Sequence, residues 1–252
     1  MKRYLTILFL FFSGLLFAQD STRVAQDDVT ILYRNEAEGG LNIHSSGFGI
    51  TFRRAWHQTG YKKKLLDIDF VSVRHPKQYK QPNPYYPDSR PFFYGKLNFV
   101  YLLRTGVGRQ HTLFSKAERS GVEVRSNYCA GLDLGITKPV YLEILVDDPY
   151  DSLAKVIDTR RYDPNDPQQQ AVENIYGPGP YFNGLGKMSI YPGIYGKLAL
   201  SFEYAGWQQK VTALEAGVVV DYFPKAIPIM AYNKNENLYV NFYLSLLWGG
   251  KW

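Results

Sequence analysis

Polar and apolar residues alternate in steps of two over much of this chain. The alternation is clearest from residue 238 to residue 252, where the even positions are mostly apolar or aromatic and the odd positions are mostly polar or small. Because successive side chains of a β-strand point to opposite faces, this pattern predicts strands with one apolar face. Similar stretches give eight predicted strands in total, at residues 38–45, 47–56, 62–75, 90–106, 120–145, 188–205, 212–222 and 238–251.

The fifth of these stretches contains a possible turn. The alternation continues through Thr137, Lys138 and Pro139, although these three residues look like a hairpin connection. We interpret 120–145 as one long strand that extends beyond a bilayer, with the proline near or outside its rim. Two strands joined at Lys138 are the alternative, and a count of ten strands also stays open.

The lengths of the connections follow a pattern too. Transmembrane β-barrels have an even number of strands, short periplasmic turns and longer outer loops. The connections after the third, fifth and seventh predicted strands are long, and all three therefore fall on one side of such a barrel. We predict an all-β fold, an eight-stranded antiparallel up-and-down transmembrane β-barrel with long extracellular loops at residues 76–89, 146–187 and 223–237.

The start of the chain has the layout of a secretory signal peptide. Met1, Lys2 and Arg3 form a basic start, an apolar stretch follows, and Ala18 precedes polar sequence. We predict a signal peptide at 1–18, a short periplasmic segment at 19–37 and an outer-membrane barrel at 38–252. The expected location after cleavage near Ala18 is therefore the cell outer membrane.

Composition narrows the class of protein further. A single cysteine excludes an internal disulfide framework and a multi-cysteine zinc site. Mean hydropathy is −0.28, and past residue 18 no apolar run approaches the ~20 residues of a membrane-spanning helix. Removal of the predicted signal peptide takes away Lys2 and Arg3 and leaves 27 basic against 23 acidic residues, a net charge of +4, which is too mild to indicate a nucleic-acid partner.

The inward faces of the predicted strands carry charges of both signs. An eight-stranded barrel is just wide enough for side chains to fill its interior, and buried charges must be paired. We therefore expect a network of ion pairs that plugs the lumen, with a narrow ion or proton channel as the alternative. Its expected members are Arg53, Asp67, Asp69, Arg104, Glu123, Arg125, Asp133, Glu143, Lys197, Glu203, Glu215 and Asp221, and Lys96 and Lys251 share these inward faces.

A catalytic site is not expected. His44 lies beside Ser45 and Ser46, which makes a nucleophile and base pair at the rim conceivable, but the sequence indicates no third member and contains no GxSxG elbow. The acidic segments 147–151 and 163–167 could bind calcium, yet no EF-hand pattern accompanies them, and Asx-Pro clusters are usually plain turns. We expect no catalytic residue, metal or cofactor, and one short helix within 168–174.

A proline-rich loop is the candidate docking surface. Residues 76–91 contain Tyr79, Tyr85 and Tyr86 among five prolines, which stiffen the loop while tyrosine offers rigid contact area. The same composition would suit a loop that packs over its own barrel. The basic stretch 108–119 on the opposite side is expected to be a solvated turn.

Five segments of the chain have a recognisable form. They are the end of the predicted signal peptide at 17–19, the turn at 108–110, the stretches 131–135 and 138–139, and the terminal strand at 242–252. Together they resemble small, uncharacterised outer-membrane β-barrel proteins of Bacteroidota. In that class the terminal aromatic strand is read by the barrel-assembly machinery. The resemblance thus implies an assembly signal that includes Phe242, Trp248 and Trp252, and it specifies no activity.

These observations favour a non-enzymatic accessory or structural subunit of an outer-membrane protein complex, in secretion or barrel assembly. The expected partners are outer-membrane lipids, the barrel-assembly machinery during insertion and other proteins of the complex. An enzyme at the rim that acts on lipid or peptide and a narrow channel are the alternatives.

Overall fold

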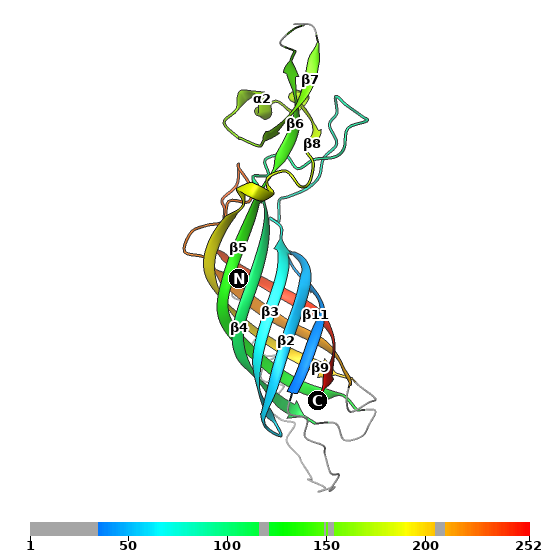
Figure 1. Cartoon of the computed structure of the whole chain (residues 1–252), viewed down its shortest axis with the longest axis vertical. Helices are drawn as coiled ribbons and strands as arrows, with labels where there is room; N and C mark the ends of the chain where they lie inside the picture. Colours follow the sequence, from blue (N-terminus) through cyan, green and yellow to red (C-terminus); the bar gives the residue numbers. More distant parts are fainter. Residues whose placement is uncertain (1–34, 116–120, 149, 151–153, 205–209) are drawn as a thin grey trace, which may run out of the picture. The chain divides into compact units, whose positions relative to one another are not determined.

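Eight of the strands close into one antiparallel barrel (Figure 1). The computed structural model describes residues 35–115, 121–148, 150, 154–204 and 210–252, so the predicted signal peptide at 1–18 lies outside the described residues. The barrel strands are β1 (Asn35–His44), β2 (Gly47–Thr59), β3 (Lys62–Val73), β4 (Asn98–Phe114), β5 (Glu123–Pro139), β9 (Ser189–Glu203), β10 (Lys210–Tyr222) and β11 (Leu238–Lys251).

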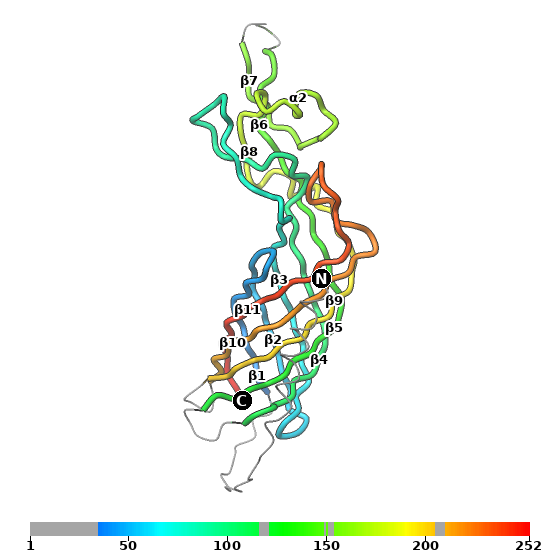
Figure 2. Tube along the Cα trace, turned by 180° about the vertical axis from the view of Figure 1, so that it is seen from behind, coloured from blue at the N-terminus to red at the C-terminus, as the bar shows by residue number. Residues whose placement is uncertain are grey.

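The barrel closes between the first and the last strand. Its order is β1-β11-β10-β9-β5-β4-β3-β2, so every strand has two neighbours. Figure 2 shows β1, β11, β10 and β9 side by side. At one end of the seam, the Asn35 amide donates to the Trp252 carbonyl at 2.9 Å, and the Trp252 amide donates to the Asn35 carbonyl at 3.0 Å. The predicted eight-stranded antiparallel barrel is confirmed.

The bounds of β1 and β4 differ from those predicted. β1 begins at Asn35, ahead of the predicted start at 38. β4 begins at Asn98 rather than at 90 and continues to Phe114, because β3 and β5 still pair with it beyond residue 106. Part of the stretch predicted as a basic turn at 108–119 is therefore strand, while residues 116–120 lie outside the described part of the chain.

The predicted strand 120–145 is wrong at its end. β5 stops at Pro139, and the chain continues as β6 (Tyr141–Asp147) in a second sheet with β7 (Lys155–Arg161) and β8 (Ile175–Pro178). Pro139 pairs with the first residue of β4, and the pairing with β9 ends at Thr137, so no barrel strand remains beside the chain beyond this point. The alternative of two strands joined at Lys138 is closer to the structure, because one strand ends at Pro139 and the next begins at Tyr141. The junction is not a hairpin, however, since β5 and β6 do not pair with each other.

We call the second sheet, made of β6, β7 and β8 in the order β7-β6-β8, the loop sheet. It follows β5 at the end of the barrel that carries the long connections, here called the long-loop end (Figure 1). A short helix is present as predicted, α2 (Pro167–Gln170), capped by the Asp166 side chain and followed by the 3-10 turn η2 (Val172–Asn174). The sheet has its own apolar core, formed by Phe92, Val140, Leu142, Ile144, Tyr162 and Ile175.

The connection after β10 folds back over the long-loop end of the lumen. At this end the inward side chains of β3 and β4 are apolar rather than charged, namely Val71, Val73, Val100 and Leu102. The connection covers them with four buried apolar side chains, Phe223, Ile227, Ile229 and Met230. We call these eight residues the apolar cap; the sequence predicts only a plain outer loop at 223–237.

The two faces of the barrel wall are inverted relative to a water-soluble protein. In β11 the side chains of Phe242, Leu244 and Leu246 are 68%, 55% and 49% exposed, whereas Asn241 and Ser245 point into the lumen and are 1% and 2% exposed. An apolar outer band around a polar interior is the arrangement of a transmembrane barrel. Among the described residues, no helix is long and apolar enough to span a membrane.

Candidate functional site

Arg53 lies at the centre of the charged lumen. Its guanidinium donates two hydrogen bonds to the Glu215 carboxylate, at 2.6 and 2.9 Å, and a third to Asp67 at 3.0 Å. Glu215 also accepts hydrogen bonds from the Tyr243 hydroxyl at 2.8 Å and from the Asn127 amide at 2.7 Å. Bidentate arginine–carboxylate pairs are the strongest and most directional of such contacts, so this group is rigid.

A second set of pairs continues toward the long-loop end. The Lys197 ammonium lies 2.7 Å from Asp67 and 2.9 Å from Asp69, and therefore links the central pair to the next layer. There Arg104 binds Asp221 through two hydrogen bonds of 2.7 and 2.8 Å. The side chain of Asp133, whose backbone pairs with that of Arg104, is fully buried in the same layer.

A third set fills the other end, where the short turns lie. Arg125 reaches Glu36 at 3.0 Å and Glu123 at 2.7 Å, and it also contacts Glu203. Lys251 pairs with Glu203 at 2.6 Å. The structure thus places every predicted lumen residue inside the barrel except Glu143.

Glu143 requires a correction. It lies in β6 of the loop sheet, where its carboxylate is 3.5 Å from the exposed Arg90 side chain. Odd-numbered residues of β5 point into the lumen, and Glu143 also has an odd number. Because β6 belongs to another sheet, an odd-numbered position there does not point into the barrel. Lys96 is likewise outside the lumen pairs, since it precedes β4 and its ammonium lies over the rings of Phe93 and Phe99.

Three charged lumen residues are not among those predicted from the sequence, namely Glu36, Glu38 and Lys63. Lys63 pairs with Glu36, and the Glu38 carboxylate is 3.7 Å from Arg125. Glu36 lies ahead of the predicted barrel. Glu38 and Lys63 could have been found from the sequence, because the alternation along β1 and β3 places both on inward faces.

Lys96 is an unusual buried cation at the long-loop end. It is 2% exposed, and burial together with the nearby Arg74, Lys138 and Lys80 lowers its pKa from the ordinary 10.5 to about 7. Its contacts with the ring faces of Phe99, at 4.0 Å, and Phe93, at 4.6 Å, partly offset the unfavourable burial of the charge.

A lysine whose pKa is lowered in the folded state destabilises that state fully below the folded pKa, and the penalty disappears as pH rises toward the unfolded pKa. We expect Lys96→Met to be more stable than the wild type at pH 7, on the order of 1–3 kcal/mol, and this advantage to shrink toward pH 10.5. Urea unfolding of both proteins at pH 7 and pH 10 measures it. If the difference in unfolding free energy between Lys96→Met and the wild type is the same at both pH values, Lys96 does not have a lowered pKa. The control is Lys155→Met, at an exposed position in β7.

The candidate catalytic pair at the rim does not form a nucleophile and base. The hydroxyls of Ser45 and Ser46 both donate to the Asn241 side-chain oxygen, at 2.9 and 2.6 Å. His44 instead accepts a hydrogen bond from the Ser46 backbone amide through Nδ1 at 3.3 Å. The geometry therefore describes a turn rather than an activated serine.

The acidic loop segments also show turn chemistry. The Asp163 carboxylate accepts from the Asn165 backbone amide at 2.9 Å, and Asp166 accepts from Gln168 at 3.0 Å. In the part of the chain that the structure describes, no three His, Cys, Asp or Glu side chains are grouped so that they could hold a metal ion.

The proline-rich loop is anchored to the loop sheet and presents two free tyrosines. The Asn83 amide donates to the Val172 carbonyl at 3.0 Å and also to that of Ile175. Tyr86 packs on Tyr176, with ring centroids 5.8 Å apart. Tyr79 and Tyr85 are 72% and 61% exposed, so of the three predicted docking residues two are available to a partner.

The three residues of the predicted assembly signal lie on the outside of the barrel. Phe242 and Trp248 project from the outer face of β11, and Trp252 follows the strand directly, at the end with the short turns. All three side chains are about half exposed or more.

No protein-family model matches this chain, and no curated protein sequence matches it. Among solved structures it is similar to Neisserial surface protein A, NspA, with 13% identity and a TM-score of 0.38 over 86% of this chain and 96% of that one. It is also similar to Ail, the attachment invasion locus protein of Yersinia pestis, solved in complex with the heparin analogue sucrose octasulfate, with 6% identity and a TM-score of 0.38 over 86% of this chain and 97% of that one. The outer membrane protein OprG from Pseudomonas aeruginosa gives 9% identity and a TM-score of 0.35, over 86% and 95% of the two chains. The fold assignment rests on the strand pairing of the present chain, not on these similarities.

Proposed function

We propose that this chain is a non-enzymatic outer-membrane β-barrel that serves as an accessory or structural subunit of a membrane protein complex, such as a secretion or barrel-assembly machine. The proposal includes export by the signal at 1–18 and insertion by the barrel-assembly machinery. The observation that carries it is an ordered loop sheet, with an open edge and free tyrosines, at the end of a barrel whose lumen is filled.

The filled lumen argues against transport. The central ion pairs are almost completely buried, with Arg53 1% and Asp67 0% exposed, and the apolar cap covers them at the long-loop end. A conducting path would have to break several buried pairs, each of which is costly to separate. A narrow channel is therefore the weaker interpretation of this barrel.

β7 offers an edge for another chain. Among the described strands it pairs with β6 alone, and nearly all of its side chains are exposed. The free backbone groups of an edge strand can pair with a strand of a second protein, a recognised mode of peptide binding. The apolar side chains of Val156 and Ile157 are 38% and 52% exposed on this strand, which adds contact area.

The experiment is a pull-down from gently solubilised outer membranes with mass spectrometry. We expect a defined set of proteins to be recovered with the wild type, and to be lost with the double variant Tyr79→Ala and Tyr85→Ala. Neither ring makes a hydrogen bond or ring contact among the described residues, so the barrel is expected to fold normally. The matched control is Tyr61→Ala, at an equally exposed tyrosine in the turn between β2 and β3.

Two results would count against the proposal. One is an isolated monomer in every mild detergent. The other is recovery of the same proteins with the wild type, the double variant and Tyr61→Ala, which would mean that the loop makes no specific contact.

A further inference from the structure

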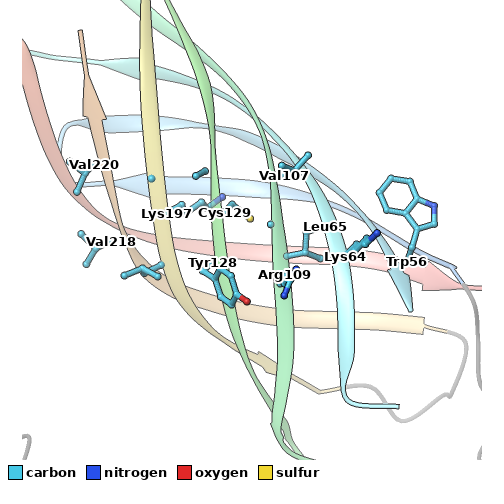
Figure 3. A pocket seen from close by; sticks show the side chains of 14 residues that line it. Trp56, Lys64, Leu65, Val107, Arg109, Tyr128, Cys129, Lys197, Val218 and Val220 are labelled. Atoms are coloured by element: carbon cyan, nitrogen blue, oxygen red, sulfur yellow. The ribbon is translucent and has the colours of Figure 1, made fainter. Parts of the chain in front are cut away.

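A hollow of about 750 Å³ lies on the outer face of the barrel, apart from the lumen and the loop sheet (Figure 3). It extends across neighbouring strands from β2 to β10. Its depth comes from small residues, because Gly196 has no side chain, and a Cβ added there would meet no atom within 4 Å. The other outward side chains that line it are mainly apolar, including Val107, Ala130, Leu198, Val218 and Val220.

Cations gather at one end of this hollow. Lys64 and Arg109 are directly paired in the ladder between β3 and β4, both point outward, and both line the hollow (Figure 3). Arg54 is exposed on β2, with its guanidinium 5.3 Å from the ring centre of Trp56. These side chains adjoin the short turn at 60–61, which is the periplasmic side if the long loops face outward.

Among the described residues, none of these cations has an acidic partner. Within the described ranges, Arg54, Lys64 and Arg109 make no ion pair. By strand alternation, every Asp and Glu of the described barrel strands belongs to the inward face, so the outer wall carries charge of one sign only. An anion from outside the chain would therefore be attracted to this part of the wall.

The surroundings indicate what that anion is attached to. A cation on the lipid face of a barrel costs about 2–4 kcal/mol at the bilayer centre and about 0–1 kcal/mol near its interfaces. An anionic headgroup attracts each such residue by about 1 kcal/mol. Trp56 and Tyr128 beside the cations are aromatic residues of the kind that lies at this interface, with an apolar body and a polar edge.

We propose that the hollow binds an anionic phospholipid of the periplasmic leaflet, with its phosphate between Lys64 and Arg109 and its acyl chains over Val107, Ala130 and Gly196. The apolar surface of the hollow adjoins its cationic end. A phospholipid has acyl chains that fit the apolar surface and a phosphate that fits the cationic end. The inference shares with the proposed function only the placement of the barrel in the outer membrane.

The test is native mass spectrometry of the purified chain in a non-ionic detergent, titrated with phosphatidylglycerol or phosphatidylcholine of the same acyl composition. We expect one phosphatidylglycerol to be retained in preference to phosphatidylcholine. The double variant Lys64→Gln and Arg109→Gln should bind phosphatidylglycerol about 30-fold more weakly, from about 1 kcal/mol for each cation. The control variant Lys155→Gln and Arg160→Gln removes two exposed charges from β7 and should bind like the wild type.

A second pair of variants tests the apolar part of the site. Gly196→Leu fills the hollow without a backbone collision and should reduce retention of the lipid. Gly39→Leu adds the same side chain to β1, where a Cβ also has room, and should not reduce it. Free glycerol phosphate should not compete, since it lacks the acyl chains.

Other outcomes overturn the proposal. Equal retention of both lipids, or equal loss with the control variants, would mean that no specific site exists. Competition by glycerol phosphate at concentrations comparable to the lipid would indicate a site for a free phosphate. A two-chain species that disappears with Gly196→Leu would show that a second copy of the barrel, rather than a lipid, occupies the hollow.

Discussion

Arg53→Met is expected to lower the stability of the folded barrel by about 3–5 kcal/mol, the largest loss we expect from any single substitution. Methionine preserves much of the length of the side chain but removes the charge. Glu215 would lose its bidentate partner and keep hydrogen bonds from the neutral Tyr243 and Asn127, and Asp67 would keep Lys197. Removing one partner of a buried pair leaves an uncompensated buried charge, which is the main source of the loss.

The control for this substitution is Arg160→Met in β7. Arg160 and Asp158 also form an ion pair, at 2.7 Å, but their side chains are 44% and 45% exposed. Exposed pairs contribute about 0–1 kcal/mol because water solvates both charges. Urea unfolding in micelles should therefore show a large shift for Arg53→Met and almost none for Arg160→Met.

A second-site variant makes the test sharper. Adding Glu215→Gln to Arg53→Met removes the stranded charge and should restore part of the stability, because the two residues act as a coupled pair. Equal shifts for the two arginine variants, or no recovery in the double variant, would contradict the assigned network.

Leu132→Arg is expected to reduce the stability of the membrane-inserted barrel by about 2–4 kcal/mol. Leu132 projects from the middle of the outer face of β5 and is 66% exposed. In water, such an exposed position would accept arginine with little effect. In a bilayer, the same position faces hydrocarbon, which does not solvate the guanidinium.

Ile157→Arg is the matched control for Leu132→Arg. Ile157 is 52% exposed on β7 of the loop sheet, and we expect its surroundings to be aqueous. Unfolding of both variants in lipid vesicles should separate them clearly. If Leu132→Arg is as stable as Ile157→Arg, the outer wall of the barrel does not face hydrocarbon.

The barrel itself could be predicted from the sequence because its physical requirements appear in local order. Each strand must present an apolar outer face and a polar inner face, and a period of two in the sequence records this requirement directly. The same period assigned Arg53, Glu215 and Lys197 to the interior without knowledge of their partners. Which carboxylate pairs with which cation could not be predicted, because pairing depends on the register across the barrel.

The wrong prediction for Glu143 arises because strands of two different sheets show the same alternation in steps of two. The segment 141–147 alternates in step with the strand before it, so Glu143 looks like a lumen residue although β6 pairs with β7 and β8. Only the pairing partners decide which sheet a strand joins, and the partners of β6 lie within 146–187, which the sequence predicts to be an outer loop.

The apolar cap was missed for a related reason. The stretch 223–230 has no regular alternation, and its apolar side chains are buried because they pack against the inward-pointing Val100 and Leu102. Apolar side chains on the inward face of a strand are the signal that could have indicated a covering segment. Their number is small, and the covering loop is distant in the sequence.

The central claim is that the barrel faces hydrocarbon on its outside and is filled with charged side chains inside. The most direct test measures how accessible spin labels along β11 are in lipid vesicles, in a chain whose Cys129 is replaced by serine. Labels at Leu244→Cys and Leu246→Cys should collide often with dissolved oxygen and rarely with a water-soluble nickel complex, while Ser245→Cys between them should resist labelling because it is buried. Greater access of the nickel complex to positions 244 and 246, or equal labelling of all three cysteines, would contradict the account.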